Sequence, residues 1–292
     1  MTDNTIDIDS NDDSVCPRCG GTVAPDGRCW DCGAGRPGYR SHLEIGLTGG
    51  AAGVSDRGRH REVNADAMAL TTAGPWTVGV VCDGVSMAPR GERAARLAAD
   101  VGAAALVARL TEGVLPETAL AESALRAGRA VTALAASPDP APACTYAAGI
   151  AGPEGVWSTW VGDSRVYWLP DEGPGTALTE DDTGELDVLA AWLGAGAGEP
   201  APRIRSYRPA VPGRLLLCTD GLWRHLPTAG ALRAVADRGA RSATADGGRP
   251  LLGAARALVD HALAAGGRDN ITALLLPVAA AVPGRPAAPG PA

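Results

Sequence analysis

The order of strand-like and helix-like segments along this 292-residue chain limits its fold more than any other feature. Short apolar runs come in groups, and the helical patterns lie together between these groups, so strands and helices do not alternate one for one. One-for-one alternation is typical of a doubly wound parallel sheet, whereas grouped strands and helices are typical of α+β proteins. We therefore predict an α+β fold with antiparallel sheets.

Period and composition place the individual segments. Strands are expected over seven apolar runs: Trp76–Cys82, Thr145–Ile150, Val156–Val161, Val166–Leu169, Arg203–Tyr207, Leu215–Thr219 and Ile271–Val278. Helices are expected over five stretches with helical periodicity: Gly91–Leu110, Pro116–Ala136, Glu185–Leu193, Thr228–Arg238 and Leu251–Ala264.

Composition divides the chain into four parts. Residues 1–13 are polar and acidic and are expected to be a disordered tail, and residues 14–36 form a compact cysteine module. The main domain is expected over residues 39–278, and residues 279–292 form a loose tail rich in proline and alanine. No run reaches the ~18 consecutive apolar residues of a membrane helix. With an acidic start unlike a signal peptide, the chain is predicted to be soluble and cytoplasmic, with no membrane partner.

Two copies of Cys-x-x-Cys-Gly, at residues 16–20 and 29–33, make up the cysteine module. Two residues between thiolates let one tight turn offer both sulfurs to the same tetrahedral ion. Two redox-active pairs are the alternative, but no βαβ context surrounds either pair. The spacing therefore predicts a small zinc ribbon that holds a structural Zn²⁺ through Cys16, Cys19, Cys29 and Cys32. Because all four ligands come from the protein, the module has a structural or docking role.

The charge balance argues against nucleic acid as a partner. The chain has 33 acidic residues against 26 basic ones, a net charge of -7, whereas proteins that bind phosphate backbones are normally basic. A nucleic-acid-reading ribbon with an accessory domain remains an alternative. It is disfavoured because Arg18, Arg28 and Arg36 are balanced by Asp26, Asp31 and the acidic tail.

Aspartates mark the ends of three apolar runs in the main domain. An aspartate at a strand end can turn its carboxylate outward, but each Asp-Gly pair alone is better explained as an ordinary turn. Three such ends gathered at one edge of a sandwich would instead form an oxygen-rich site for a hard divalent cation, Mg²⁺ or Mn²⁺. The three sites are Asp83-Gly84, Asp220-Gly221 and Asp269-Asn270.

Taken together, the motifs of the main domain resemble those of the metal-dependent protein serine/threonine phosphatases of type 2C, the PPM family. They keep the family order over nearly all of residues 42–278. The motifs are Arg61-x-x-Asn64-x-Asp66, Asp83-Gly84 with Gly91-Glu92, Gly162-Asp163-Ser164-Arg165, Leu178-Thr179-Glu180-Asp181, Thr219-Asp220-Gly221 and Asp269-Asn270. The resemblance implies two packed antiparallel sheets flanked by helices, an α-β-β-α sandwich, preceded in this chain by the ribbon.

The resemblance also implies which residues hold the metals. Asp83 would bridge two divalent ions, with the Gly84 carbonyl on one ion and Asp220 and Asp269 on the other. Asp163 would hold a third, weaker ion together with Asp220. The implied cofactors are therefore two or three Mn²⁺ or Mg²⁺ ions, besides the structural Zn²⁺.

The remaining roles concern the substrate. By the resemblance, Asp66 lies near the metals without binding them directly, and Arg61 grips the substrate phosphate with its planar, permanently charged guanidinium. Water held between two divalent ions about 3.5–4 Å apart is acidic enough to supply hydroxide near neutral pH, and it would attack phosphorus in line. No covalent enzyme intermediate is needed, and Cys82, Cys144 and Cys218 are all expected to be buried strand residues.

Four positions near the first metal depart from the family pattern: Ala65, Val85, Ser86 and Met87. Family members often carry Glu or Gln at the first, and many eukaryotic members carry His at the second. Hydrolysis of phosphoserine and phosphothreonine in proteins is the main prediction. A catalytically weak scaffold or sensor that binds phosphoproteins is the alternative. Phosphorylated proteins are the expected partners, and the ribbon is a candidate docking module for a serine/threonine kinase or its substrates.

Overall fold

The computed structural model describes residues 5–7, 15–23, 27–36, 38, 40–184 and 188–280. Most of the expected acidic tail (1–13) and of the proline- and alanine-rich tail (279–292) therefore lies outside the described residues. Within the first tail, expected to be disordered, residues 5–7 form strand β1 against the edge strand β2. An edge strand offers unpaired N–H and C=O groups, which such a segment can satisfy.

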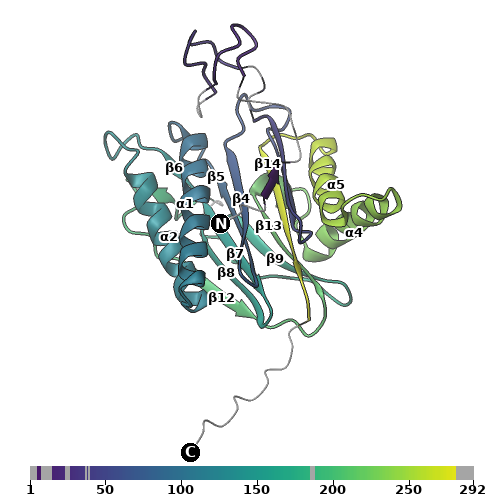
Figure 1. Ribbon diagram of the computed structural model, residues 1–292. Coiled ribbons are helices and arrows are strands. Elements are labelled where there is room, and N and C mark those ends of the chain that lie inside the picture. Colours follow the sequence, from purple (N-terminus) through teal and green to yellow (C-terminus); the bar gives the residue numbers. More distant parts are fainter. Residues whose placement is uncertain are drawn as a thin grey trace, which may run out of the picture.

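In the described part of the chain, antiparallel strands form two large sheets and one two-stranded sheet (Figure 1). The five-stranded sheet runs in the order β12 (Arg203–Tyr207), β8 (Gly155–Val161), β7 (Tyr146–Gly152), β5 (Trp76–Asp83) and β4 (Asp66–Ala73). The seven-stranded sheet runs in the order β1 (Thr5–Asp7), β2 (His42–Leu47), β3 (Ala52–Asp56), β14 (Ile271–Val278), β13 (Gly213–Cys218), β9 (Arg165–Pro170) and β10 (Thr176–Ala177). Strands β6 (Ala143–Cys144) and β11 (Leu193–Gly194) form the two-stranded sheet.

Helices cover the outer faces of both large sheets (Figure 1). Helices α1 (Gly91–Thr111) and α2 (Pro116–Thr132) pack on the five-stranded sheet, and α4 (Ala229–Ala245) and α5 (Pro250–Ala264) pack on the seven-stranded sheet. The one-turn helix α3 (Asp220–Trp223) follows β13 directly. Pro116 and Pro250 occupy first-turn positions, where a missing N–H costs no helical hydrogen bond.

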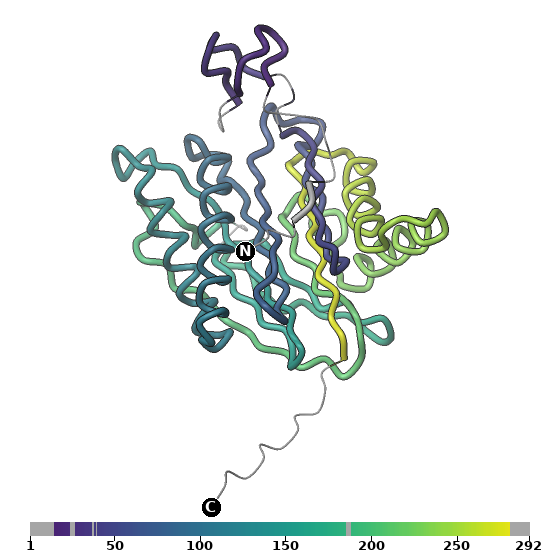
Figure 2. Tube along the Cα trace, in the orientation of Figure 1, coloured from purple at the N-terminus to yellow at the C-terminus, as the bar shows by residue number. Residues whose placement is uncertain are grey.

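The apolar runs of the seven-stranded sheet are continuous because both of its faces are buried. In β13, Leu215 and Leu217 face the other sheet, whereas Leu216 and Cys218 face the helices. β14 alternates in the same way and pairs with β13 on one side and with β3 on the other, so the last strand of the main domain lies beside one of its first (Figure 2). The predicted α-β-β-α sandwich is confirmed.

The helix predicted over Glu185–Leu193 is wrong for its described residues. Leu189 instead forms an isolated bridge with Thr183, and Leu193 begins β11. Leu193 is fully buried in the core beneath α1 and α2, so tertiary packing overrides the local helical pattern.

A histidine at the start of β2 makes the fold sensitive to alkaline pH. His42 lies opposite Asp56 of β3, with Nδ1 2.8 Å from Oδ2 of Asp56, and Nε2 is 3.4 Å from Oε1 of Glu44. The hydrogen bond to Asp56, followed by that to Glu44, raises the pKa of His42 from 6.5 to about 9. The stabilisation is therefore complete below pH 6.5 and is lost as the pH rises through about 9.

We expect the melting temperature of the wild type to fall between pH 7 and pH 10 by more than that of His42→Gln. Thermal unfolding followed by circular dichroism over this pH range measures the difference. Parallel profiles for the two proteins would contradict the assignment.

Candidate metal centre

The predicted carboxylates meet at one end of the sandwich, where four strands of the two sheets begin or end. Asp66 starts β4 and lies directly opposite Asp83 at the end of β5. One residue, Thr219, separates Asp220 from the end of β13, and one residue, Asn270, separates Asp269 from the start of β14. Strands from both sheets thus bring together side chains that are far apart in the sequence.

Asp83 is the carboxylate most strongly affected by the others. Burial raises its pKa well above the usual value, and Asp66, Asp220, Asp163 and Asp269 raise it further. Its backbone is fixed by Thr145, whose Oγ1 accepts a hydrogen bond from the Asp83 N–H at 2.9 Å. The Thr145 N–H in turn donates to the Asp83 carbonyl at 2.8 Å. The strand end therefore holds a carboxylate whose anionic form needs a nearby cation.

Asp66 is buried at 8% exposure and is held by two threonine hydroxyls. Thr219 and Thr272 donate to its Oδ2 at 2.8 and 2.7 Å. Its Oδ1 is buried and has no hydrogen-bond partner among the described residues. Burial raises the pKa of Asp66 to about 7 in spite of the two hydroxyls. One oxygen is thus fixed by the fold, and the other is left for a ligand.

Each of the two remaining strand-end carboxylates pairs with an arginine. Arg61 donates from Nε and Nη2 to both oxygens of Asp269, each at 2.8 Å. Arg224 donates from Nε to Oδ2 of Asp220 at 2.8 Å, whereas Oδ1 of Asp220 is buried and unpartnered among the described residues. Arg61, which is expected to bind the substrate phosphate, therefore lies beside the carboxylate cluster.

Glycine is required beside two of these aspartates because the backbones of neighbouring segments pass too close for a side chain. A Cβ at Gly221 would lie 2.0 Å from the carbonyl oxygen of Asn270, and one at Gly84 would lie 2.5 Å from the carbonyl carbon of Gly91. Such distances exclude any larger residue. The Asp-Gly pairs thus serve close packing at the site as well as turning the chain.

Asp163 lies in the turn between β8 and β9 and completes the cluster. The indole Nε1 of Trp223 donates to its carbonyl at 2.9 Å, which ties the turn to α3. Burial, followed by Asp220 and Asp181, raises the pKa of the Asp163 carboxyl to about 6. The next motif is attached to the same turn, because Arg165 binds both oxygens of Asp181 at 2.8 and 2.7 Å.

The donor set fits a hard divalent cation. It consists of carboxylates whose anionic forms are disfavoured by burial and by one another, and two of their oxygens are buried without a partner. Oxygen donors of this kind are those that Mg²⁺ and Mn²⁺ prefer. The chemistry of these oxygens therefore suits the expected ions.

A pocket of about 220 Å³ opens beside the cluster. Its lining includes Arg61, Gly84 and three of the positions that depart from the family pattern, Ala65, Val85 and Ser86. The fourth, Met87, is exposed to solvent. Three of the four departures therefore line the pocket beside the cluster, and none of the four removes one of its carboxylates.

Sequence reasoning missed the residues that orient the carboxylates. Thr219 belongs to one of the motifs and Thr272 lies just after another, but neither motif indicates that these hydroxyls orient a carboxylate. Arg224 is a polar residue beyond a predicted strand and carries no signal. Asn270 was quoted as part of a motif, and its role is structural: its side chain accepts from the Ala65 N–H and donates to the carbonyls of Arg57 and Val63. These contacts join segments about 200 residues apart.

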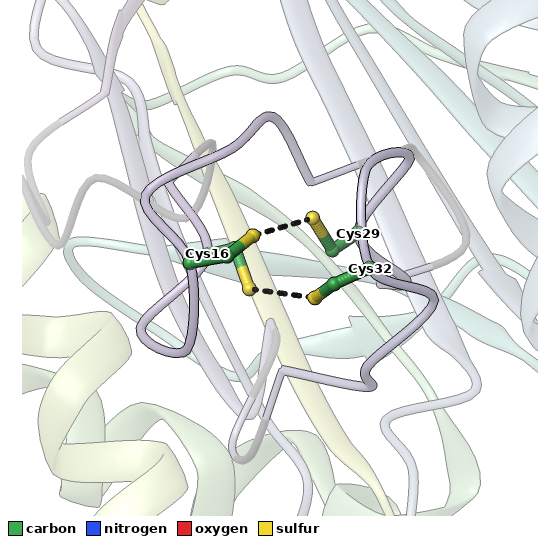
Figure 3. Close-up of side chains that lie close together, drawn as sticks. Cys16, Cys29 and Cys32 are labelled. Atoms are coloured by element: carbon green, nitrogen blue, oxygen red, sulfur yellow. Dashed lines mark hydrogen bonds between the residues drawn. The ribbon is translucent and has the colours of Figure 1, made fainter.

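The four cysteines of the predicted ribbon lie together in a second, separate cluster. Their sulfurs are within 4.8 Å of one another, and Figure 3 shows the thiols of Cys16, Cys29 and Cys32 pointing toward a common centre. Backbone N–H groups of Arg18 and Cys19 lower the pKa of Cys16 to about 7, whereas the neighbouring sulfurs of Cys32 and Cys29 raise the pKa of Cys19 to about 12. A lowered thiol pKa favours the thiolate, the form that binds metal.

Comparison with known proteins agrees with this geometry. A family model described as protein phosphatase 2C matches residues 55–261, more than half of the chain. The chain belongs to the protein phosphatase 2C family. This phosphatase is thus an enzyme of the metal-dependent serine/threonine type, and the scaffold alternative is not favoured. The family, the fold and the activity predicted from the sequence are confirmed.

Solved structures of bacterial phosphatases resemble this phosphatase over most of their length. MsPP of Mycobacterium smegmatis, a PPM Ser-Thr phosphatase, is 26% identical; the match covers 78% of this chain and 97% of MsPP, with a TM-score of 0.58. PppA, a key regulatory component of T6SS in Pseudomonas aeruginosa, is 25% identical, covers 77% and 95%, and has a TM-score of 0.58. PstP/Ppp of Mycobacterium tuberculosis shares the fold at 24% identity, 78% and 98% coverage, and a TM-score of 0.53.

Comparison with curated protein sequences gave no significant match. Across the described part of the phosphatase, every helix is too short or too polar to span a lipid bilayer.

Proposed function

We propose that Asp83, Asp220, Asp269 and the Gly84 carbonyl hold two catalytic Mn²⁺ or Mg²⁺ ions in this phosphatase. Asp163 would add a weaker site, and Asp66 would lie beside the ions without binding them directly. The observation that carries the proposal is the pair of unpartnered buried oxygens, Oδ1 of Asp66 and Oδ1 of Asp220, within a cluster of mutually repelling carboxylates. When bound, the ions would acidify a shared water so that it can attack phosphorus.

The residues of the chain would orient this chemistry. Thr219 and Thr272 hold Oδ2 of Asp66, so Oδ1 is directed into the cluster, where it can accept a hydrogen bond from the attacking water. Arg61 contacts Asp269 through Nε and Nη2, which leaves Nη1 to bind an oxygen of the substrate phosphate. A guanidinium placed in this way neutralises charge on the phosphoryl oxygens as it develops.

The substrates are proposed to be phosphoserine and phosphothreonine side chains of proteins. The pocket of about 220 Å³ reaches from Arg61 to Gly84 and is open to solvent, so it can admit a phosphorylated side chain presented by another protein. A serine/threonine kinase and its substrates are the proposed partners in signal transduction, with the ribbon as docking module. The cytoplasm is the proposed location, because a reducing compartment keeps the ribbon cysteines as thiols.

Hydrolysis of a phosphothreonine peptide across a Mn²⁺ titration tests the proposal. We expect wild-type turnover to depend on Mn²⁺. Thiol-modifying reagents are expected not to inhibit it, because no cysteine belongs to the proposed metal centre. Asp220→Ala is expected to reduce turnover at least about a hundredfold, because it removes a direct ligand. Asp171→Ala, which removes an exposed carboxylate between β9 and β10, is the matched control.

Equal turnover in the wild type and Asp220→Ala at saturating Mn²⁺ would contradict the proposed ligand set. Tight binding of the peptide without any hydrolysis would instead support the scaffold alternative. Calorimetric titration of Mn²⁺ separates the two cases, because a pure scaffold has no need of the ions.

A further inference from the structure

Arg224 has no role in the chemistry described so far, yet it is bound to one of the central carboxylates. It lies one turn after Asp220, at the end of α3, and donates from Nε to Oδ2 of Asp220 at 2.8 Å. Oδ1 of the same carboxylate is buried and unpartnered within the described part of the chain. The two oxygens of Asp220 therefore differ: one is free for a metal, and the other is already bound to a guanidinium.

The indole of Trp223 contacts both this guanidinium and the turn that carries Asp163. Trp223 donates from Nε1 to the carbonyl of Asp163 at 2.9 Å, which fixes the ring against the turn that carries this carboxylate. The guanidinium carbons of Arg165 and Arg224 lie 3.6 and 5.0 Å from the centre of the ring. Contacts between a guanidinium and an aromatic ring restrict the side chain as well as attract it. Arg224 is therefore positioned by more than its pairing with Asp220.

The charge of Arg224 acts on several carboxylates of the cluster. It interacts electrostatically with Asp163 and Asp269 in addition to Asp220. Asp163 is otherwise surrounded by like charges, from Asp220 and Asp181. The chain itself therefore supplies a cation that pairs with Oδ2 of Asp220 and offsets part of the repulsion on Asp163.

We propose that Arg224 competes with a third divalent cation between Asp163 and Asp220, so that this phosphatase binds two catalytic ions tightly and the third weakly. The inference rests on the proposed metal centre. A guanidinium on Oδ2 of Asp220 competes for one of the two oxygens that a third ion could bind, and its positive charge repels that ion. Competition from this side chain therefore accounts for the weakness of the proposed third site.

An ordinary helix ion pair is the competing explanation. Asp220 and Arg224 are spaced i, i+4, and the Arg224 side chain is 52% exposed, so the pair by itself would add little to stability. A pair of this kind would have no effect on how many metal ions are bound. The number of bound ions therefore separates the two explanations.

The experiment is a calorimetric titration of the full-length, zinc-loaded protein with Mn²⁺ alone, supported by electron paramagnetic resonance of the free ion. We expect the wild type to bind two Mn²⁺ ions tightly and a third weakly. Arg224→Gln is expected to bind the third ion about tenfold more tightly than the wild type does. Arg224→Lys, which keeps the charge, is expected to retain the wild-type stoichiometry. Arg126→Gln is the matched control, because Arg126 forms an i, i+4 pair with Glu122 on α2, away from the site.

Three tight sites in the wild type would overturn the proposal, as would an unchanged third site in Arg224→Gln. The proposed function fails by a different result, namely a wild type that hydrolyses no phosphopeptide at saturating Mn²⁺. Because the titration counts ions without requiring turnover, an active wild type with an unchanged Arg224→Gln titration would reject the role of Arg224 alone.

Discussion

Asp83→Asn is expected to lower Mn²⁺-dependent phosphopeptide hydrolysis by at least about a thousandfold. The substitution preserves the shape of the side chain but removes the negative charge that we propose to bridge the two ions. Asp83 interacts with all four of the other carboxylates of the cluster, so its charge is central to the site. Steady-state kinetics over a Mn²⁺ range that reaches saturation measures the loss.

The same substitution is expected to raise the melting temperature of the metal-free protein. Without ions, burial and four neighbouring carboxylates disfavour the Asp83 anion, and a neutral amide removes that repulsion. An inactive but more stable variant therefore cannot be explained by misfolding. Asp171→Asn, at an exposed position between β9 and β10, is the matched control and is expected to change neither property. Full turnover in Asp83→Asn would show that the two-metal assignment is wrong.

Cys29→Ser is expected to abolish stoichiometric zinc binding and to unfold residues 15–36 while the sandwich remains folded. Cys29 is 3% exposed, and its sulfur lies 3.5 Å from that of Cys19. The described buried apolar residues of the module are only Cys16, Val23 and Cys29, too few to form a core of their own. Folding of so short a segment therefore depends on the metal, which contributes on the order of 10 kcal/mol in modules of this kind.

Hydrogen exchange resolved by mass spectrometry measures this effect, because it reports on the ribbon and the sandwich separately. Zinc content is measured on the same samples. Trp30→Ser is the matched control: its side chain is 72% exposed, next to Cys29 in the sequence, and is not a ligand. Slow exchange over residues 15–36 in a zinc-free Cys29→Ser protein would contradict a structural zinc site.

Much of the candidate site could be predicted from the sequence because it lies at strand ends. A continuous apolar run that stops at Asp-Gly marks both the strand and the place where its last carboxylate leaves the sheet. Asp83 and Asp220 were found in this way, and the spacing of the cysteines indicated their cluster equally directly. Both signals are local, since each depends on residues within a few positions of one another.

The helix expected over Glu185–Leu193 shows where local signals fail. Its apolar spacing suits a helix, but Leu193 is buried beneath α1 and α2 as part of a strand. The first three strands of the main domain, β2, β3 and β4, were also absent from the predicted set. These strands contain many small or polar side chains, so they show no apolar run, and their burial depends on packing against the opposing sheet.

The sequence by itself therefore determined the class of the fold and the family, and it indicated which carboxylates and which four thiols are candidate metal ligands. It could do so because periodicity and motif spacing are read along the chain. The tertiary structure alone decided which oxygen of Asp66 and of Asp220 has no partner among the described residues. Thr219 and Thr272 reach Asp66 across 153 and 206 residues, and Arg61 reaches Asp269 across 208. Such pairings arise only when the two sheets pack against each other, because no local pattern encodes a contact between distant strand ends.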